Sequence, residues 1–98
     1  MPSSIDYMSE VPNLYTPEAI IFRSGLDSLN TDKLAVPVTV YLDQAGNHAL
    51  AHGNHRAYHF YLEGKLDELQ RKLIGFLPKD ISQDPYYHPV SELKIVER

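Results

Sequence analysis

The chain of 98 residues carries nine Lys and Arg, thirteen Asp and Glu, five His and no Cys. A disulfide framework, a Cys-based zinc site and a thiol nucleophile are therefore excluded, and the length fits one domain with a modest core. The formal charge of −4 disfavours nucleic acid as a partner, because polyanion binders usually carry a basic excess. The composition is ordinary for a globular protein, and we find neither a leader pattern nor an apolar run of about 20 residues. We therefore expect a soluble cytoplasmic protein that does not enter a membrane.

The first third of the chain gives mixed signals. Three prolines predict that residues 1–17 form an extended arm, with room for a short edge strand. The Thr-Pro-Glu sequence at 16–18 has the order of a helix start: a capping hydroxyl, a proline and an acid. The Ile-Ile-Phe run at 20–22 fits either that helix or a buried strand, because periodicity does not decide such short runs. Residues 27–33 are polar and predict a connection.

The clearest pattern lies in the middle of the chain. Residues 36–42 alternate β-branched and aromatic side chains and predict a strand, with Val36, Val38, Val40 and Leu42 on one face. A turn at 43–47, where Gly46 and Asn47 tolerate a positive φ, and a second strand at 48–52 complete a hairpin. A helical pattern follows at 55–63 and should stop at Gly64.

The last third is less regular. Leucines at positions 62, 66, 69 and 73 have helical spacing, and we favour a short helix followed by a short strand near 71–77. The charges between Lys65 and Lys72 would then form a solvated helix face with ion pairs four residues apart. Residues 79–89 predict a loop, and residues 90–96 a short strand or helix.

The junction between the second strand and the helix is the segment that could carry chemistry. Gly53 lets backbone approach a ligand, Asn54 is a good N-cap, and His55 and Arg56 add donors in the first helical turn. That turn has unpaired N–H groups and a partial positive charge, which together suit a phosphate. The alternative is an ordinary junction whose polar residues cap the helix.

The order strand, turn, strand, Gly-Asn-His-Arg, helix resembles the ParB/sulfiredoxin superfamily, best over residues 37–64. The resemblance implies a small α+β fold in which a hairpin precedes a motif-bearing helix, as one ParB-like domain over 1–98 with its best-matched core at 36–77. It implies a nucleotide- or phosphate-ligand-binding domain of a prokaryotic or phage protein, with a nucleotide and Mg²⁺ as the expected cofactors. The phosphate-binding residues would be Gly53, Asn54, His55 and Arg56.

The chain also departs from the family. Asn54 occupies the position of the sulfiredoxin cysteine, which excludes sulfiredoxin activity. Too few residues follow position 64 for the helix-turn-helix domain of the partition proteins, so sequence-specific DNA binding is disfavoured. His52 stands where relatives often have Asp, and no catalytic residue can be named.

Two alternatives to simple binding remain open. A phosphotransferase or nucleotide hydrolase on this fold would need Mg²⁺ and a carboxylate base, and Asp43 and Glu63 are the nearest acids in sequence. A degenerate ParB-like domain could act through protein–protein contacts or as a homo-oligomer, using the Leu62–Leu73 stripe.

The histidines and tyrosines have simpler interpretations. His48, His52, His55 and His59 would share a face only in one continuous helix, which Gly53 interrupts, so we predict no metal site. His48 and His52 should instead lie on one face of a strand. The tyrosines are expected to pack in the core rather than to stack on bases.

Overall fold

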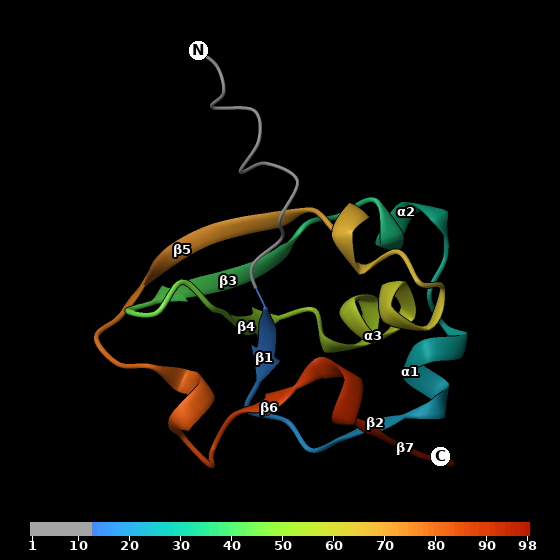
Figure 1. Cartoon of the computed structure of the whole chain (residues 1–98). Coiled ribbons are helices and arrows are strands. Elements are labelled where there is room, and N and C mark those ends of the chain that lie inside the picture. Colours follow the sequence, from blue (N-terminus) through green and yellow to red (C-terminus); the bar gives the residue numbers. More distant parts are fainter. Residues whose placement is uncertain (1–12) are drawn as a thin grey trace.

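Two sheets of unequal size organise residues 13–98, which are the part of the chain described by the computed structural model (Figure 1). Three helices and several single 3₁₀ turns connect their strands. In chain order the elements are β1 (Leu14–Thr16), β2 (Ile20–Phe22), α1 (Arg23–Asp27), α2 (Thr31–Leu34), β3 (Val38–Asp43), β4 (His48–His52), α3 (Asn54–Leu62), η2 (Leu66–Glu68), β5 (Arg71–Leu77), η3 (Ile81–Gln83), β6 (His88–Pro89), η4 (Val90–Glu92) and β7 (Lys94–Val96).

The larger sheet has the strand order β5-β3-β4-β1-β6, and β2 and β7 form a separate parallel pair. Within the larger sheet, β3 and β4 are antiparallel, β5 runs parallel to β3, and β1 runs parallel to β4. The chain is thus a small α+β domain with a mixed five-stranded sheet. This confirms the predicted fold class at that level.

The central hairpin forms where the sequence predicts it. Val38 and Val40 are fully buried on β3, while Val36 lies outside the strand and is exposed. Gly46 has a φ of 87° in the turn, as its freedom from a Cβ allows. Asn47 does not adopt a positive φ, and its side chain instead donates to Asp43. A register shift beside Thr39 interrupts the alternation of β4, so the premise that placed His48 and His52 on one face is wrong.

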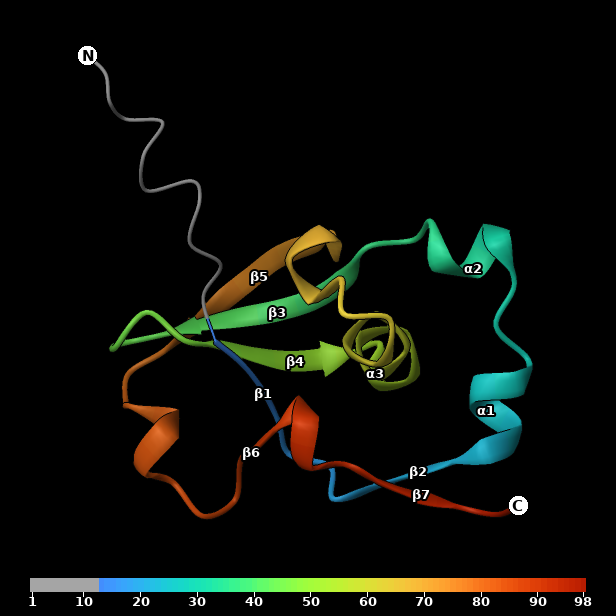
Figure 2. The ribbon, with the colours of Figure 1, turned by 45° about the vertical axis from the view of Figure 1, so that its right-hand side comes forward.

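Helix α3 leaves directly from β4 and packs its buried face on the sheet (Figure 2). Ala57 and Tyr58 are its buried residues, and they join a core formed with Leu14, Ile21, Val38, Val40, Leu50, Leu69, Val90 and Leu93. The predicted stop at Gly64 is confirmed: this residue has a φ of 71°. The Lys65 N–H donates to the Phe60 carbonyl over 2.9 Å, which is the bond expected when a helix ends on a left-handed glycine.

The N-terminal predictions need correction. The part of the predicted arm at 1–12 lies outside the described residues, but Leu14–Thr16 forms β1 between β4 and β6 rather than an edge strand. No helix begins at Thr16, because its hydroxyl accepts the Glu18 N–H and turns the chain toward β2. The Ile20–Phe22 run is therefore a strand, and the polar connection after it contains the short helix α2.

The leucine stripe is not a helix face. Gly64 ends α3 before it, Leu66–Glu68 makes only one 3₁₀ turn, and Leu73 belongs to β5. Leu69 is buried whereas Leu62 and Leu73 are exposed, so the four leucines do not share one environment. The ion pairs predicted four residues apart are absent from the described residues for the same reason. The strand predicted near 71–77 is confirmed as β5.

Candidate functional site

A hollow of about 710 Å³ opens at the N-terminal end of α3. All of its lining residues come from two stretches of the chain, within residues 18–33 and 51–56. Its volume falls in the range of small-ligand sites. The fold thus brings Gly53, Asn54, His55 and Arg56 together on the wall of one hollow, opposite residues of β2, α1 and α2.

Gly53 is the N-cap of α3 and has a φ of 109°, a conformation that favours glycine. Its carbonyl accepts the Ala57 N–H, the first hydrogen bond of the helix, over 2.9 Å. A Cβ at this position would lie 2.4 Å from Cγ1 of Val38. The close approach that requires glycine here is therefore one between the junction and β3, rather than the approach of a ligand.

The N–H groups of Asn54, His55 and Arg56 have no hydrogen-bond partner within residues 13–98. Asn54 was expected to cap the helix, and that expectation is wrong. It is the first helical residue, and its side-chain oxygen accepts a hydrogen bond from the buried hydroxyl of Thr16 on β1. The first turn therefore keeps three free backbone donors at the positive end of the helix dipole.

The Arg56 guanidinium is partly engaged by the chain itself. Its Nη1 donates to the carbonyl oxygens of Val36 and Pro37, over 2.8 and 3.2 Å. These bonds tie the start of β3 to α3 and hold the positive charge at the rim of the hollow. A guanidinium has five N–H groups, so these two contacts leave donors for a ligand.

His55 packs against α1. A Cβ on Gly25 would lie 2.2 Å from its Nε2, so the ring lies directly over the Gly25 backbone. The Nε2 atom is buried and has no partner among the described residues. A donor that His55 offers to a ligand would therefore have to be Nδ1 or the backbone N–H.

Sequence reasoning missed several side chains of the hollow. Lys33 on α2 adds a second cation, and Glu18 adds a carboxylate. Ile20, Phe22 and Leu29 give the hollow an apolar part, and the first two of these are unusually exposed for their size. No local pattern marks these residues, because they reach the junction only through the folding of β2, α1 and α2 around α3.

The two acids proposed as catalytic bases lie elsewhere. Glu63 follows the last residue of α3, at the end opposite Gly53. Asp43 ends β3, about 17 Å along the strand from Val38 at the usual rise per residue. Its oxygens accept the N–H groups of Ala45, Asn47 and Ile81. Burial alone would raise the pKa of Asp43, but these hydrogen bonds, with that of the Asn47 side chain, hold it below its ordinary value. Asp43 is therefore a structural anchor.

No cluster of three or more metal-binding side chains occurs between residues 13 and 98. Mg²⁺ usually takes one or two carboxylates together with phosphate oxygens and water. Among the residues that the structure describes, Glu18 is the one acidic side chain that lines the hollow. A Mg²⁺ ion at the hollow would therefore have to be held mainly by the phosphates of a ligand, because the lining offers it a single carboxylate.

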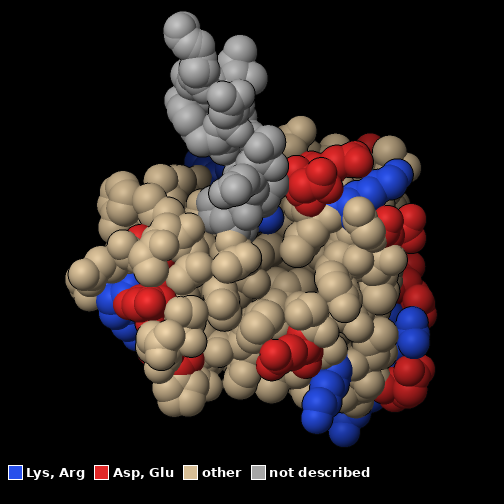
Figure 3. All heavy atoms as spheres, viewed as in Figure 1, with Lys and Arg blue, Asp and Glu red and all other residues tan. Residues whose placement is uncertain are grey.

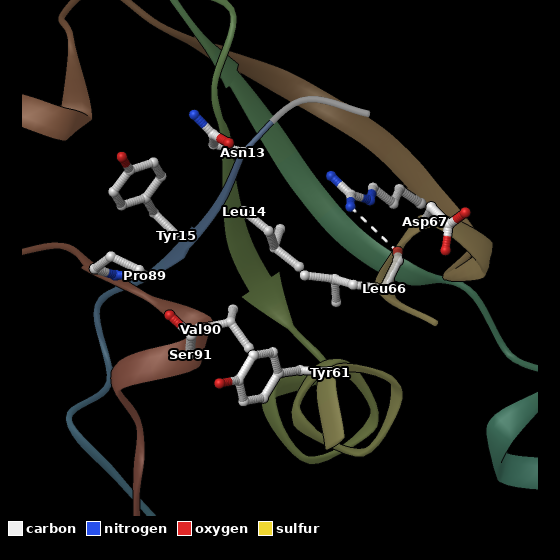
Figure 4. A pocket seen from close by; sticks show the side chains of 10 residues that line it. Asn13, Leu14, Tyr15, Tyr61, Leu66, Asp67, Pro89, Val90 and Ser91 are labelled. Atoms are coloured by element: carbon white, nitrogen blue, oxygen red, sulfur yellow. Dashed lines mark hydrogen bonds between the residues drawn. The ribbon is translucent and has the colours of Figure 1, made fainter. Parts of the chain in front are cut away.

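A second hollow, of about 410 Å³, lies on the face shown in Figure 4. Tyr15 and Tyr61 lie on its wall, and Arg71 lines it too, with Nη2 3.5 Å from the Leu66 carbonyl. Arg71 Nη1 also lies 3.1 Å from Nδ1 of His48. Burial and this guanidinium lower the pKa of His48. A guanidinium has donors only, so Nδ1 of His48 accepts this hydrogen bond. The arginine is committed to these contacts, and the motif residues are not part of this hollow.

Charges of both signs are interspersed over the described residues on the face shown in Figure 3. No protein-family model, curated protein or solved structure matches the chain. The resemblance to the ParB/sulfiredoxin superfamily therefore depends on the Gly-Asn-His-Arg sequence at 53–56 and on the order of the elements around it. Within the described chain, no helix has the length and apolar character that crossing a membrane requires.

Proposed function

We propose that this chain binds a phosphorylated small ligand, and a nucleotide in particular, in the hollow beside Gly53–Arg56. The observation that carries the proposal is the open first turn of α3, whose three N–H groups lack partners within residues 13–98. Backbone donors at a helix N-terminus are well suited to phosphate oxygens. The helix is nine residues long, so its dipole extends over more than two turns.

The side chains around this turn are complementary to such a ligand. Arg56 and Lys33 place two cations at the hollow, and the phosphate would lie between them and the helix. Ile20, Phe22 and Leu29 offer an apolar surface for a base or another flat, weakly polar group. The ligand would thus have an anionic end and an apolar end.

We also propose that the fold is a variant of the ParB/sulfiredoxin type. Its support is the hairpin of β3 and β4 that continues through Gly53 into α3, in the order that the resemblance implies. Binding is favoured over phosphotransfer or hydrolysis, because residues 13–98 supply a single carboxylate, Glu18, to the hollow. It would have to serve as both metal ligand and base.

Thermal-shift measurements with CTP, ATP, ADP, GTP and inorganic phosphate, each with and without Mg²⁺, test the proposal. At about 100 times its Kd, a ligand should stabilise the folded chain by roughly 2.7 kcal/mol. A shift without product formation supports a binding domain, and a shift with release of phosphate supports the enzyme instead.

Two variants locate the site. Lys33→Gln removes one cation at nearly constant size, and Arg56→Lys keeps the charge but loses the bidentate geometry. Both should weaken binding, whereas Lys65→Gln, which removes an exposed lysine outside the hollow, should not. If no nucleotide or phosphate raises the midpoint, or if all three variants bind as the wild type does, the proposal is wrong.

A further inference from the structure

A side hollow of about 300 Å³ opens next to the hollow beside Gly53–Arg56. Its described lining consists of Leu29, Lys33, Val36 and Arg56, and all of these except Val36 also line the larger hollow. Val36 belongs to the connection that runs from α2 to the start of β3 in Figures 1 and 2. The two hollows are therefore neighbours, and the cations Lys33 and Arg56 stand at the boundary between them.

The Arg56 guanidinium reaches from one hollow to the other. Its Nη1 donates to the Val36 carbonyl over 2.8 Å, next to the side hollow. Its Nη2 lies next to the larger hollow, because a Cβ on Gly53 would be 3.2 Å from that atom. A guanidinium presents five N–H groups in a fixed, planar fork. Its remaining N–H groups can therefore donate to the oxygens of a group that lies across the boundary.

Lys33 is the second cation at this boundary. Its backbone N–H donates to the Asn30 side chain over 2.9 Å, which fixes the start of α2, and its Nζ lies 3.4 Å from the Ser28 carbonyl. Ser28 lines the larger hollow. Within residues 13–98, no carboxylate lines the side hollow. The boundary is therefore cationic, and its two positive charges match a bridging group that has a negative charge on each of two phosphates.

Beyond the two cations the side hollow is apolar. Val36 is exposed, with 52% of its surface accessible, and Leu29 is half-buried. A terminal phosphate placed against these side chains would lose water without gaining hydrogen bonds. A ring or another weakly polar group would instead bury their surface. Ile20 and Phe22 give the larger hollow an apolar part as well, so organic groups fit on both sides of the cations.

We propose that the ligand is a pyrophosphate-bridged dinucleotide, with one base in the larger hollow, the other in the side hollow and the pyrophosphate at the boundary. Lys33 and Arg56 would each face one of the two phosphates. This inference rests on the proposed function, because it adds a second organic half to a ligand of the same phosphate site. A mononucleotide in the larger hollow would leave the apolar surface of Val36 in water.

The first test compares matched ligands on the full chain by titration calorimetry. Diadenosine diphosphate should bind about tenfold or more tightly than ADP, and dicytidine diphosphate likewise relative to CDP, because burial of the second base adds affinity. The bridged ligands carry less negative charge, so charge alone predicts the opposite order. If the nucleoside diphosphates bind and the bridged ligands bind no more tightly, the inference is wrong while the proposed function stands. If no ligand of either kind binds, both are wrong.

Val36 distinguishes the two hollows, so its substitution locates the second base. Val36→Asn replaces apolar surface by a polar side chain of similar size and keeps the backbone carbonyl that accepts from Arg56. It should cut the advantage of the bridged ligand over the nucleoside diphosphate to about threefold or less. Leu62→Asn is the matched control, because Leu62 is equally exposed (54%) and lies outside both hollows. An advantage as large in Val36→Asn as in the control would overturn the inference.

The absence of cysteine from the sequence allows a direct measurement of occupancy. Val36→Cys places a single thiol at the side hollow, and its rate of modification by iodoacetamide reports access to that hollow. A saturating bridged ligand should slow the modification about tenfold or more, and the matching nucleoside diphosphate should slow it much less. Leu62→Cys should react equally fast with every ligand. Equal protection of position 36 by the two kinds of ligand would contradict the inference.

Discussion

At the scale of single residues, Gly53 controls the geometry of the candidate site. It combines a φ of 109° with a contact that leaves no space for a Cβ beside Val38. Gly64 also has a positive φ, of 71°, but a Cβ there would meet nothing within 4 Å. The two glycines therefore separate backbone strain from steric overlap.

We expect Gly53→Ala to lower the free energy of unfolding by about 2–4 kcal/mol, because strain and overpacking add. Gly64→Ala should cost only about 1–2 kcal/mol, since strain acts alone there. Urea unfolding of both variants measures the difference. Equal losses in the two variants would mean that the contact with Val38 contributes nothing to the requirement for glycine.

The residue scale also shows what a sequence can reveal about a site. The Gly53–Arg56 junction is visible because all its members are adjacent in the chain and follow a strand pattern. Lys33 and Glu18 are more than a dozen residues from it in sequence and carry no motif, so only the fold places them at the hollow. The role of Asn54 escapes local patterns for a similar reason, because its partner Thr16 lies on β1, which reaches the junction only by pairing with β4.

At the scale of elements, local signals and long-range pairing account for the successes and the failures. The hairpin of β3 and β4, and helix α3, have alternation, turn residues and a terminal glycine within their own sequences. β1, β2, β6 and β7 have two or three residues each and exist only because distant strands pair with them. The leucines at 62–73 have a spacing that fits a helix, but Gly64 and the pairing of β5 with β3 determine the outcome.

Asp43 links several elements, and its ionisation should be visible in the stability of the whole domain. It joins the end of β3, the turn before β4 and the start of η3 at Ile81. Its pKa lies below the ordinary value of 3.8, so the unfolded chain binds more protons than the folded chain in the interval between the two values. The stability that it contributes is therefore complete above about pH 3.8 and is lost as the pH falls toward the folded pKa.

We expect Asp43→Asn to lower the free energy of unfolding at neutral pH by about 2–3 kcal/mol, because one acceptor of buried N–H groups becomes a donor. Its stability should also fall less steeply on acidification than that of the wild type. Unfolding curves measured at several pH values between neutral and strongly acidic check both effects. Asp27→Asn, at an exposed position, is the control, and an acid profile of Asp43→Asn as steep as that of the wild type would contradict the assignment.

At the scale of the whole molecule, the hollow and the exposed part of strand β5 lie at different positions along β3. The hollow is built from residues within 18–33 and 51–56, and it meets β3 at the Val38 end through Gly53. Phe76 pairs with Leu42, near the other end of β3. The strand rise places these two positions about 13 Å apart, beyond the range at which substitutions usually couple. Substitutions in the exposed part of β5 should therefore leave ligand binding unchanged.

This independence predicts the behaviour of variants that affect one surface each. Phe76→Lys should leave the nucleotide-induced shift of the unfolding midpoint unchanged, because the side chain of Phe76 is exposed and lies outside the hollow. Lys33→Gln should reduce the nucleotide-induced shift, because it removes a cation from the lining of the hollow. Thermal unfolding of both variants and of the wild type, with and without nucleotide, measures the two shifts. If Phe76→Lys also weakens nucleotide binding, the independence of the two surfaces is wrong.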